Sequence, residues 1–171
     1  YYKNALDGPR VVREGKDVTI VATSHGVLEA MRAADVLHKI GCSAEVIDMR
    51  VLRPLNVEPI VGSVRKTGRL VTVDTGFVRF GIGAEILASV MTEAFNALKA
   101  APVRLGLPDH PTPSSRGLIP GFYPDSQRIV REVGKMLSLD QAKVDSALKE
   151  LDIQRKDLQI DQPDPFFKGP F

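Results

Sequence analysis

The residues with the clearest capacity for chemistry are a polar triplet, Ser24, His25 and Gly26, and two arginines, Arg50 and Arg53. The triplet lies between a predicted strand and a predicted helix, at the edge where open α/β sheets bind ligands. N–H groups at the start of a helix can hold an anion, and guanidinium groups bind carboxylates and phosphates. The five residues are therefore candidates for an anion-binding site. The plainer alternative, favoured by the frequency of helix caps, is that Ser24 caps the helix, His25 is solvated and the arginines form local salt bridges.

Other motifs do not predict catalysis. Gly81 and Gly83 form part of a dinucleotide-binding pattern, but Ile86 stands where the third glycine belongs. Backbone freedom and close helix packing explain these glycines better. The single cysteine, Cys42, excludes an internal disulfide and a multi-cysteine metal site, and no activating base is near it in the sequence. Since His110 also lacks carboxylates at metal-ligand spacing beyond its neighbour, we predict no catalytic residue and no metal site.

The composition is that of an ordinary soluble globular protein and argues against two classes of partner. The chain has 171 residues, of which 43% are hydrophobic and 26% are charged, which is enough for one domain with a real core. A net charge of +2 is too small to indicate binding to nucleic acid or to an anionic membrane. The apolar stretches are also far shorter than the ~18 residues of a membrane span. Because the chain opens without Met or a signal peptide, we expect a piece of a longer polypeptide from a reducing, cytoplasm-like compartment.

Strand and helix patterns alternate along the chain. Short β-branched runs predict strands at Val18 to Ala22, Ala44 to Asp48, Leu70 to Val73 and Val103 to Leu105. Periodic apolar residues predict helices at Val27 to Ile40, at Asn56 to Lys66, around Ile86 to Leu98, after Asp125, and at Leu139 to Leu151. Gly41 and Gly68 are expected to end the first two of these helices. This order predicts an α/β fold of three layers, with a mostly parallel sheet covered by helices on both faces.

The ends of the chain differ from its middle. We expect residues 1–14 to be a linker or arm, residues 15–137 to form the α/β domain, and residues 138–171 to add a helix and a Pro/Phe-rich tail. Ser138 and Gln141 stand at capping-box spacing at the start of that helix. The Pro/Gly-rich loop from Pro108 to Pro124 is too long to be a mere connector. The tail cannot build a core of its own, and we predict that it lies across a partner chain or a neighbouring domain.

Several ordered segments resemble the C-terminal domain of the transketolase family. Within that family they are most similar to the β subunit of the thiamine-dependent decarboxylating component of 2-oxo acid dehydrogenase complexes, of the pyruvate and branched-chain type. The resemblance covers roughly Arg10 to Leu137. Its segments are Gly15–Val21, Glu45–Leu55, Lys66–Val73, Phe80–Ile86, Ala101–Arg104, Asp109–Pro113 and Gly121–Asp125.

The resemblance implies a mixed sheet of about five strands, one of them antiparallel. It also implies that the parent enzyme decarboxylates a 2-oxo acid on thiamine diphosphate with Mg²⁺ and passes the acyl group to a lipoyl carrier. The cofactor motif and the catalytic glutamate of the family lie in other domains, so this chain is expected to bind no cofactor and to have no activity alone. The implied partners are the α subunit, the pyrimidine-binding domain, a second copy, and the lipoyl acyltransferase core. The implied compartment is the cytoplasm, or the mitochondrial matrix in a eukaryote.

Two alternatives stay open at this stage. The chain could be the C-terminal domain of a single-chain transketolase or deoxyxylulose-phosphate synthase, although the segments around Arg53 and His110 fit the dehydrogenase branch better. It could instead be a regulatory module that captures a small anion at the five candidate residues.

Overall fold

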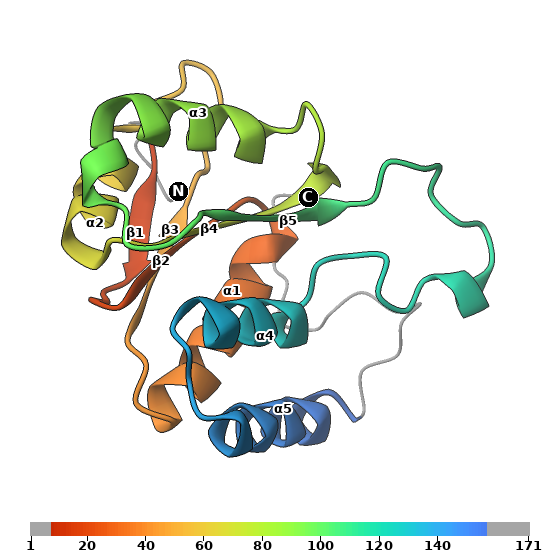
Figure 1. The fold of residues 1–171 in the computed structure, drawn as a ribbon. Coiled ribbons are helices and arrows are strands. Elements are labelled where there is room, and N and C mark those ends of the chain that lie inside the picture. Colours follow the sequence, from red (N-terminus) through yellow and green to blue (C-terminus); the bar gives the residue numbers. More distant parts are fainter. Residues whose placement is uncertain (1–7, 157–171) are drawn as a thin grey trace, which may run out of the picture.

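The structure, a computed structural model, describes residues 8–156 and contains one five-stranded mixed sheet (Figure 1). The strand order is β1-β3-β2-β4-β5, with β1 antiparallel to β3 and the other neighbours parallel. This confirms the predicted fold class, including the single antiparallel strand. The strands are β1 (Arg10–Arg13), β2 (Val18–Ala22), β3 (Ala44–Asp48), β4 (Leu70–Phe77) and β5 (Val103–Leu107).

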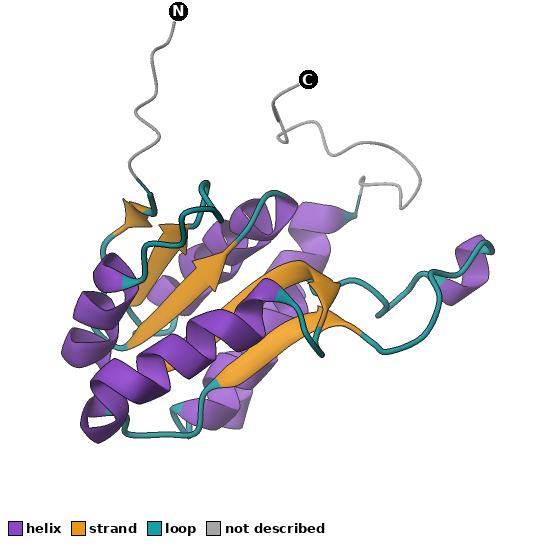
Figure 2. Cartoon of the chain, turned by 90° about the horizontal axis from the view of Figure 1, so that it is seen from above, coloured by secondary structure: helices purple, strands orange, loops and turns teal. Residues whose placement is uncertain are grey.

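Helices cover both faces of the sheet (Figures 1 and 2). Helices α1, α4 and α5 pack together on one face, and α2 and α3 pack together on the other. The α-helices are α1 (His25–Lys39), α2 (Glu58–Thr67), α3 (Ile82–Ala94), α4 (Ser126–Met136) and α5 (Gln141–Arg155), and two short 3-10 turns are η1 (Phe95–Ala97) and η2 (Arg116–Leu118). Within the described residues, no helix is long and apolar enough to cross a membrane.

Two hydrophobic clusters follow from this arrangement, one on each face of the sheet. The smaller cluster lies under α2 and α3 and is built around residues such as Ile60 and Ile86. The larger one lies under α1, α4 and α5, and it includes Leu37, Val133 and Leu151. Because Leu151 is fully buried there, α5 shares the core of the sheet domain.

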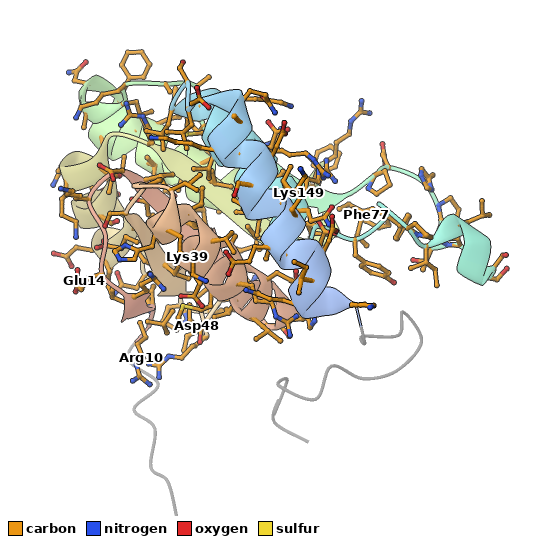
Figure 3. All side chains as sticks on the ribbon, turned by 90° about the horizontal axis from the view of Figure 1, so that it is seen from below. Arg10, Glu14, Lys39, Asp48, Phe77 and Lys149 are labelled. Carbon is orange, nitrogen blue, oxygen red and sulfur yellow. The ribbon has the colours of Figure 1, made fainter. Side chains whose placement is uncertain are left out.

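The first residues of the chain differ from the linker that the sequence predicts. Residues Arg10–Arg13 form the edge strand β1, in which Arg10 pairs with Asp48 of β3 (Figure 3). The sequence hides this strand because it is only four residues long, half-exposed and irregular in register, so no apolar period marks it. The division of the chain at residues 14 and 137 stays a prediction about domain boundaries. The predicted Pro/Phe-rich tail lies outside the described residues.

Helix ends confirm two predicted signals and correct a third. Gly41 has φ 89° and follows α1, with Gly41 N–H donating to His38 O (3.0 Å) and Cys42 N–H donating to Leu37 O (2.9 Å), which is a Schellman ending. Asp125 caps α4 through a hydrogen bond from Arg128 N–H (2.9 Å).

The predicted capping box at Ser138 is wrong. Asp140 is the N-cap of α5 and accepts from Lys143 N–H (3.2 Å), while Ser138 lies in the preceding turn with φ 50°. An aspartate two residues later competes for the same role, and spacing alone did not separate the two caps.

Candidate functional site

The carboxyl ends of the parallel strands meet at one edge of the sheet, where the predicted site lies. Met49 N–H, just after β3, donates to Ala22 O at the end of β2 (3.0 Å). Thr23 N–H donates to Val73 O of β4 (3.2 Å). Val78 N–H, after β4, donates to Leu107 O of β5 (3.0 Å). The four connections that follow these strands therefore form one continuous surface, which we call the carboxyl edge.

Ser24 adopts a strained backbone conformation at the turn from β2 into α1. Its φ of 48° and ψ of −126° lie in a region that suits glycine and is costly for other residues. The turn is held by Gly26 N–H donating to Thr23 O (2.9 Å) and Val27 N–H donating to Ser24 O (3.0 Å). Ser24 is the N-cap residue of α1, the position that the plainer alternative gives it, but its hydroxyl makes no cap hydrogen bond. The φ and ψ of Ser24 differ from the β-region values that are typical of an N-cap residue.

Gly26 is buried where α1 begins against β4. A Cβ atom on this glycine would lie 3.2 Å from both Cγ1 and the carbonyl oxygen of Val73. The small residue thus lets the helix approach the strand closely. His25 is half-buried beside it.

The two arginines lie on the loop after β3. The Arg50 guanidinium donates to the Gly8 carbonyl (3.3 Å), and the Arg50 amide donates to Oδ1 of Asp48 (3.1 Å). Gly8 precedes β1, which lies on the opposite side of β3 from β2, so this hydrogen bond directs Arg50 toward the β1 side of the edge. Burial raises the pKa of Asp48 above its ordinary value, although the Arg50 amide and the charges of Arg50 and Arg10 act in the other direction.

The five candidate residues thus share one edge, but the contacts described do not join them into one site. Arg53 is exposed in the turn 52–55, and Ser24 is exposed as well. The anion site stays a prediction. A rise in melting temperature with phosphate that is abolished by Arg53→Ala would support it, and no rise would leave it without support.

One polar pair at the carboxyl edge was missed by sequence reasoning. Thr23 Oγ1 donates to Oδ1 of Asp74 (2.9 Å), which joins the end of β2 to the middle of β4. The other oxygen, Oδ2, faces Gly76 and Gly81, where added Cβ atoms would lie 2.9 and 3.6 Å away. Only the position of both residues directly after predicted strands could have suggested this pair.

The glycines of the partial nucleotide pattern serve packing. A Cβ atom on Gly81 would lie 2.2 Å from the carbonyl oxygen of Phe77, and one on Gly83 would lie 2.6 Å from Oγ1 of Thr72. Both distances are too short for a real contact. Gly81 has φ −76°, so close approach, not conformational freedom, explains it.

The described residues hold no group of three His, Cys, Asp or Glu side chains that could bind a metal ion. Cys42 is buried, and its burial, together with the charge of Asp17, raises its pKa to about 12 despite the opposing charge of Arg69. The thiol is therefore not a ready nucleophile at neutral pH.

A shallow groove of about 530 Å³ lies away from the carboxyl edge, where the end of α1 meets α5. None of the five candidate residues lines it. Lys39, at its border, forms an ion pair with Glu150. The lining residues are Lys39, Ile40, Gly41, Ala142, Lys143 and Ser146.

Comparison with protein families gives a match over most of the described residues. Residues 9–129 match the model of the transketolase C-terminal domain, which covers every strand and the start of α4. The chain belongs to the transketolase C-terminal domain family.

The relatives of this transketolase C-terminal domain include subunits of one enzyme. The chain is 49% identical to the pyruvate dehydrogenase E1 component subunit beta of Pisum sativum over 122 residues, which are 71% of this chain and 34% of the relative. It is 43% identical to the same subunit of Saccharomyces cerevisiae over 133 residues, or 77% of this chain and 36% of the relative. The matched part thus spans about a third of the length of these relatives.

A solved structure shares the fold of this transketolase C-terminal domain. It is described as a split gene transketolase, an inactive beta4 tetramer, and it superposes with a TM-score of 0.66 at 34% identity. The superposition covers 78% of this chain and 43% of that chain. Helix α5 lies beyond the family match yet packs in the same core.

Proposed function

We propose that the chain is the C-terminal domain of the β subunit of a thiamine-diphosphate-dependent 2-oxo acid dehydrogenase. The parent enzyme would oxidatively decarboxylate a 2-oxo acid and acylate a lipoyl carrier. The observation that carries this proposal is the 49% identity to the β subunit of pyruvate dehydrogenase E1 over 122 residues. The similarity to a split transketolase is lower, at 34%, which favours the dehydrogenase over the single-chain transketolase or deoxyxylulose-phosphate synthase alternative.

We assign this domain a role in assembly and not in the reaction itself. Thiamine diphosphate with Mg²⁺ supplies the decarboxylation chemistry when it is bound, and its metal needs oxygen ligands held close together. The described part of the chain offers no such acidic cluster, so its residues do not fit this cofactor. We derive no step of the reaction through them.

Several partners follow from this assignment. They are the α subunit, the pyrimidine-binding domain of the same enzyme, and the lipoyl acyltransferase core. Self-association is a further part of the proposal, since the split transketolase with the same fold is a beta4 tetramer. The mitochondrial relatives favour the matrix if the source is a eukaryote, and the cytoplasm is the alternative in a bacterium.

The test uses the endogenous polypeptide that carries this sequence. Its intact mass is expected to be roughly twice that of this chain, two domains of ordinary size. That polypeptide, copurified with an α subunit and supplied with thiamine diphosphate and Mg²⁺, is expected to decarboxylate pyruvate or a branched-chain 2-oxo acid. A mass roughly four times that of this chain would favour a single-chain transketolase by the same arithmetic. A native chain no longer than this one, or clear binding of thiamine diphosphate to this chain alone in calorimetry, would contradict the assembly role.

A further inference from the structure

The shallow groove between the end of α1 and the start of α5 combines apolar and basic groups. Ile40, Gly41 and Ala142 supply apolar lining, and the charged residues that line it are both lysines, Lys39 and Lys143. We call it the α1–α5 groove. A Cβ atom on Gly41 would meet nothing within 4 Å, so the groove is open at this point. By charge complementarity, it fits a segment that carries acidic as well as apolar side chains.

The two lysines of the groove retain capacity for binding. Lys39 forms an ion pair with Glu150, but its side chain is still 60% exposed, and an ammonium group has three N–H donors. Lys143 forms no ion pair with any residue in the range 8–156. The carboxylate of Asp140, just before α5, accepts the backbone amide of Lys143 (3.2 Å). Both ammonium groups can therefore accommodate a further carboxylate.

One side of α5 leads from this groove to the end of the described residues. Lys143, Ser146, Glu150 and Ile153 follow one another at steps of three or four residues along the helix, so they share one side of it. Lys143 and Ser146 line the groove, and Glu150 contacts α1 through Lys39. This side therefore follows the boundary between α5 and α1. At its end Ile153 is 75% exposed, a large apolar side chain with little cover from residues 8–156.

The sequence after Lys156 has a composition that complements the groove. Residues 157–171 lie outside the described residues and contain three aspartates against one lysine, together with three phenylalanines. The acidic residues are Asp157, Asp161 and Asp164, and the aromatic ones are Phe166, Phe167 and Phe171. Pro163 and Pro165 favour an extended backbone among them.

This segment is long enough to reach the groove of its own chain. Helix α5 rises by about 20 Å between Lys143 and Lys156. The eleven residues from Asp157 to Phe167 span about 35 Å when extended. A chain that turns back after Lys156 therefore passes Ile153 and brings its aspartates and phenylalanines to the start of α5.

We propose that residues 157–167 fold back along α5 and dock in the α1–α5 groove of the same chain. Their carboxylates pair with Lys39 and Lys143, and their aromatic rings cover the apolar part of the groove. The segment then acts as a strap that holds α5, which lies beyond the family match, against α1. It also closes this boundary to other proteins. The sequence alone predicts instead that the tail lies across a partner chain or a neighbouring domain, and the measurements that follow separate the two.

The test places one fluorescent reporter in the full 171-residue chain, which contains no tryptophan. In Phe167→Trp, docking should give a blue-shifted emission and slow quenching by acrylamide, because the indole ring leaves water. Both signals should weaken in high salt, which screens the ion pairs. Both should be independent of protein concentration, since docking within one chain does not respond to mass action.

Lys143→Glu in the same reporter chain should lower the ratio of docked to undocked tail by about three- to tenfold, because an attraction between exposed charges becomes a repulsion. Its emission should therefore shift to the red. Lys99→Glu is the matched control. It makes the same change of charge at an exposed position next to Gly68, which ends α2 on the opposite face of the sheet, and it should leave the emission unchanged. Circular dichroism melting of each variant shows whether the fold is intact.

A cysteine pair gives a second measurement that needs no tryptophan. Under mild oxidation, Ser146→Cys with Phe166→Cys should form a disulfide within one chain, because a docked tail brings the two Cα atoms within about 7 Å. Asp145→Cys with Phe166→Cys should not, since Asp145 neither lines the groove nor shares its side of α5. Cys42 is buried and does not compete. A solvent-exposed reporter together with no disulfide in the Ser146 pair would overturn the proposal, and so would equal emission for Lys143→Glu and Lys99→Glu. A blue shift that grows with concentration, or a disulfide between two chains, would show docking on a partner and would overturn it as well.

Discussion

The backbone amide of Ser126 donates a 2.7 Å hydrogen bond to Oε2 of Glu29, which lies 97 positions earlier in the chain. Glu29 is only 1% exposed, and its other oxygen accepts a hydrogen bond from Arg32 (2.9 Å). A buried carboxylate on α1 thus satisfies the first amide of α4. The contact fixes where the long loop between β5 and α4 returns to the domain.

We expect Glu29→Gln to lower the free energy of unfolding by about 1–3 kcal/mol, because a charge-assisted hydrogen bond in a buried site is replaced by a weaker one. Urea unfolding measures the loss, and faster hydrogen exchange of the Ser126 amide locates it. Glu85→Gln, at an exposed position of α3, is the control. Unchanged stability and unchanged exchange at Ser126 would show that the contact does not hold α4.

The strain at Ser24 predicts an unusual order of stability. Ser24→Gly should be more stable than Ser24→Ala by about 1 kcal/mol, since glycine adopts the observed φ and ψ without strain. The same pair at Ser146, an exposed position within α5, should show the reverse order, because alanine is the better helix former. Thermal and urea unfolding of the four variants would refute the strain if alanine were preferred at both positions.

Two glycine substitutions should change the free energy of unfolding in opposite directions. Gly81→Ala is expected to cost about 1–3 kcal/mol, since its new Cβ would collide with a backbone oxygen that cannot rotate away. Gly62→Ala should stabilise the chain by up to about 1 kcal/mol, because Gly62 lies within α2 with open space around its Cα. Denaturant unfolding of both variants compares them directly. Equal effects would mean that Gly81 is not needed for packing.

The acid sensitivity of the chain should depend on Glu45. Burial alone would raise its pKa, but hydrogen bonds from Lys66, Ser63 and the Gly15 amide outweigh burial and hold the pKa below its ordinary value. The unfolded chain therefore takes up this proton first as the pH falls. The stabilisation is fully present above about pH 4.5 and is lost as the pH falls from there through the folded pKa.

Glu45→Gln tests this dependence. The variant should be less stable than the parent at neutral pH, and its free energy of unfolding should change less steeply below about pH 4.5. Glu93→Gln, at an exposed position of α3, serves as the control and should follow the parent. If the free energy of unfolding of Glu45→Gln and that of the parent changed with pH in the same way, the role assigned to Glu45 would be contradicted.

The buried strands and most helices could be predicted from local patterns. The strands Val18–Ala22 and Ala44–Asp48 have the predicted bounds, because short runs that contain Val and Ile are bounded by turn-forming segments. Strand β4 extends to Phe77, beyond the predicted Val73. Its last residues pair with β5 and alternate in exposure, so they carry no apolar run.

The contacts that depend on tertiary structure could not be predicted. Glutamate is typical of an exposed helix face, yet Glu29 is buried because α4 begins against it. The pair Thr23 and Asp74 meets only because β2 and β4 are neighbours in the sheet. The exposure of Phe80 has no sequence signal either, since an aromatic residue near a glycine-rich turn is as compatible with a core position.

The two faces of the sheet are completed at different moments of synthesis. The cluster under α2 and α3 needs nothing beyond Leu98. Helix α1 packs on the sheet earlier, but the cluster around it is complete only when α4 and α5 have been made, with Leu151 as its last fully buried member. Almost the whole domain must therefore be synthesised before the apolar side chains of α1 are fully buried. A nascent chain that stalls before Ser126 would expose this surface to its neighbours, and such unfinished chains are the form most prone to aggregate.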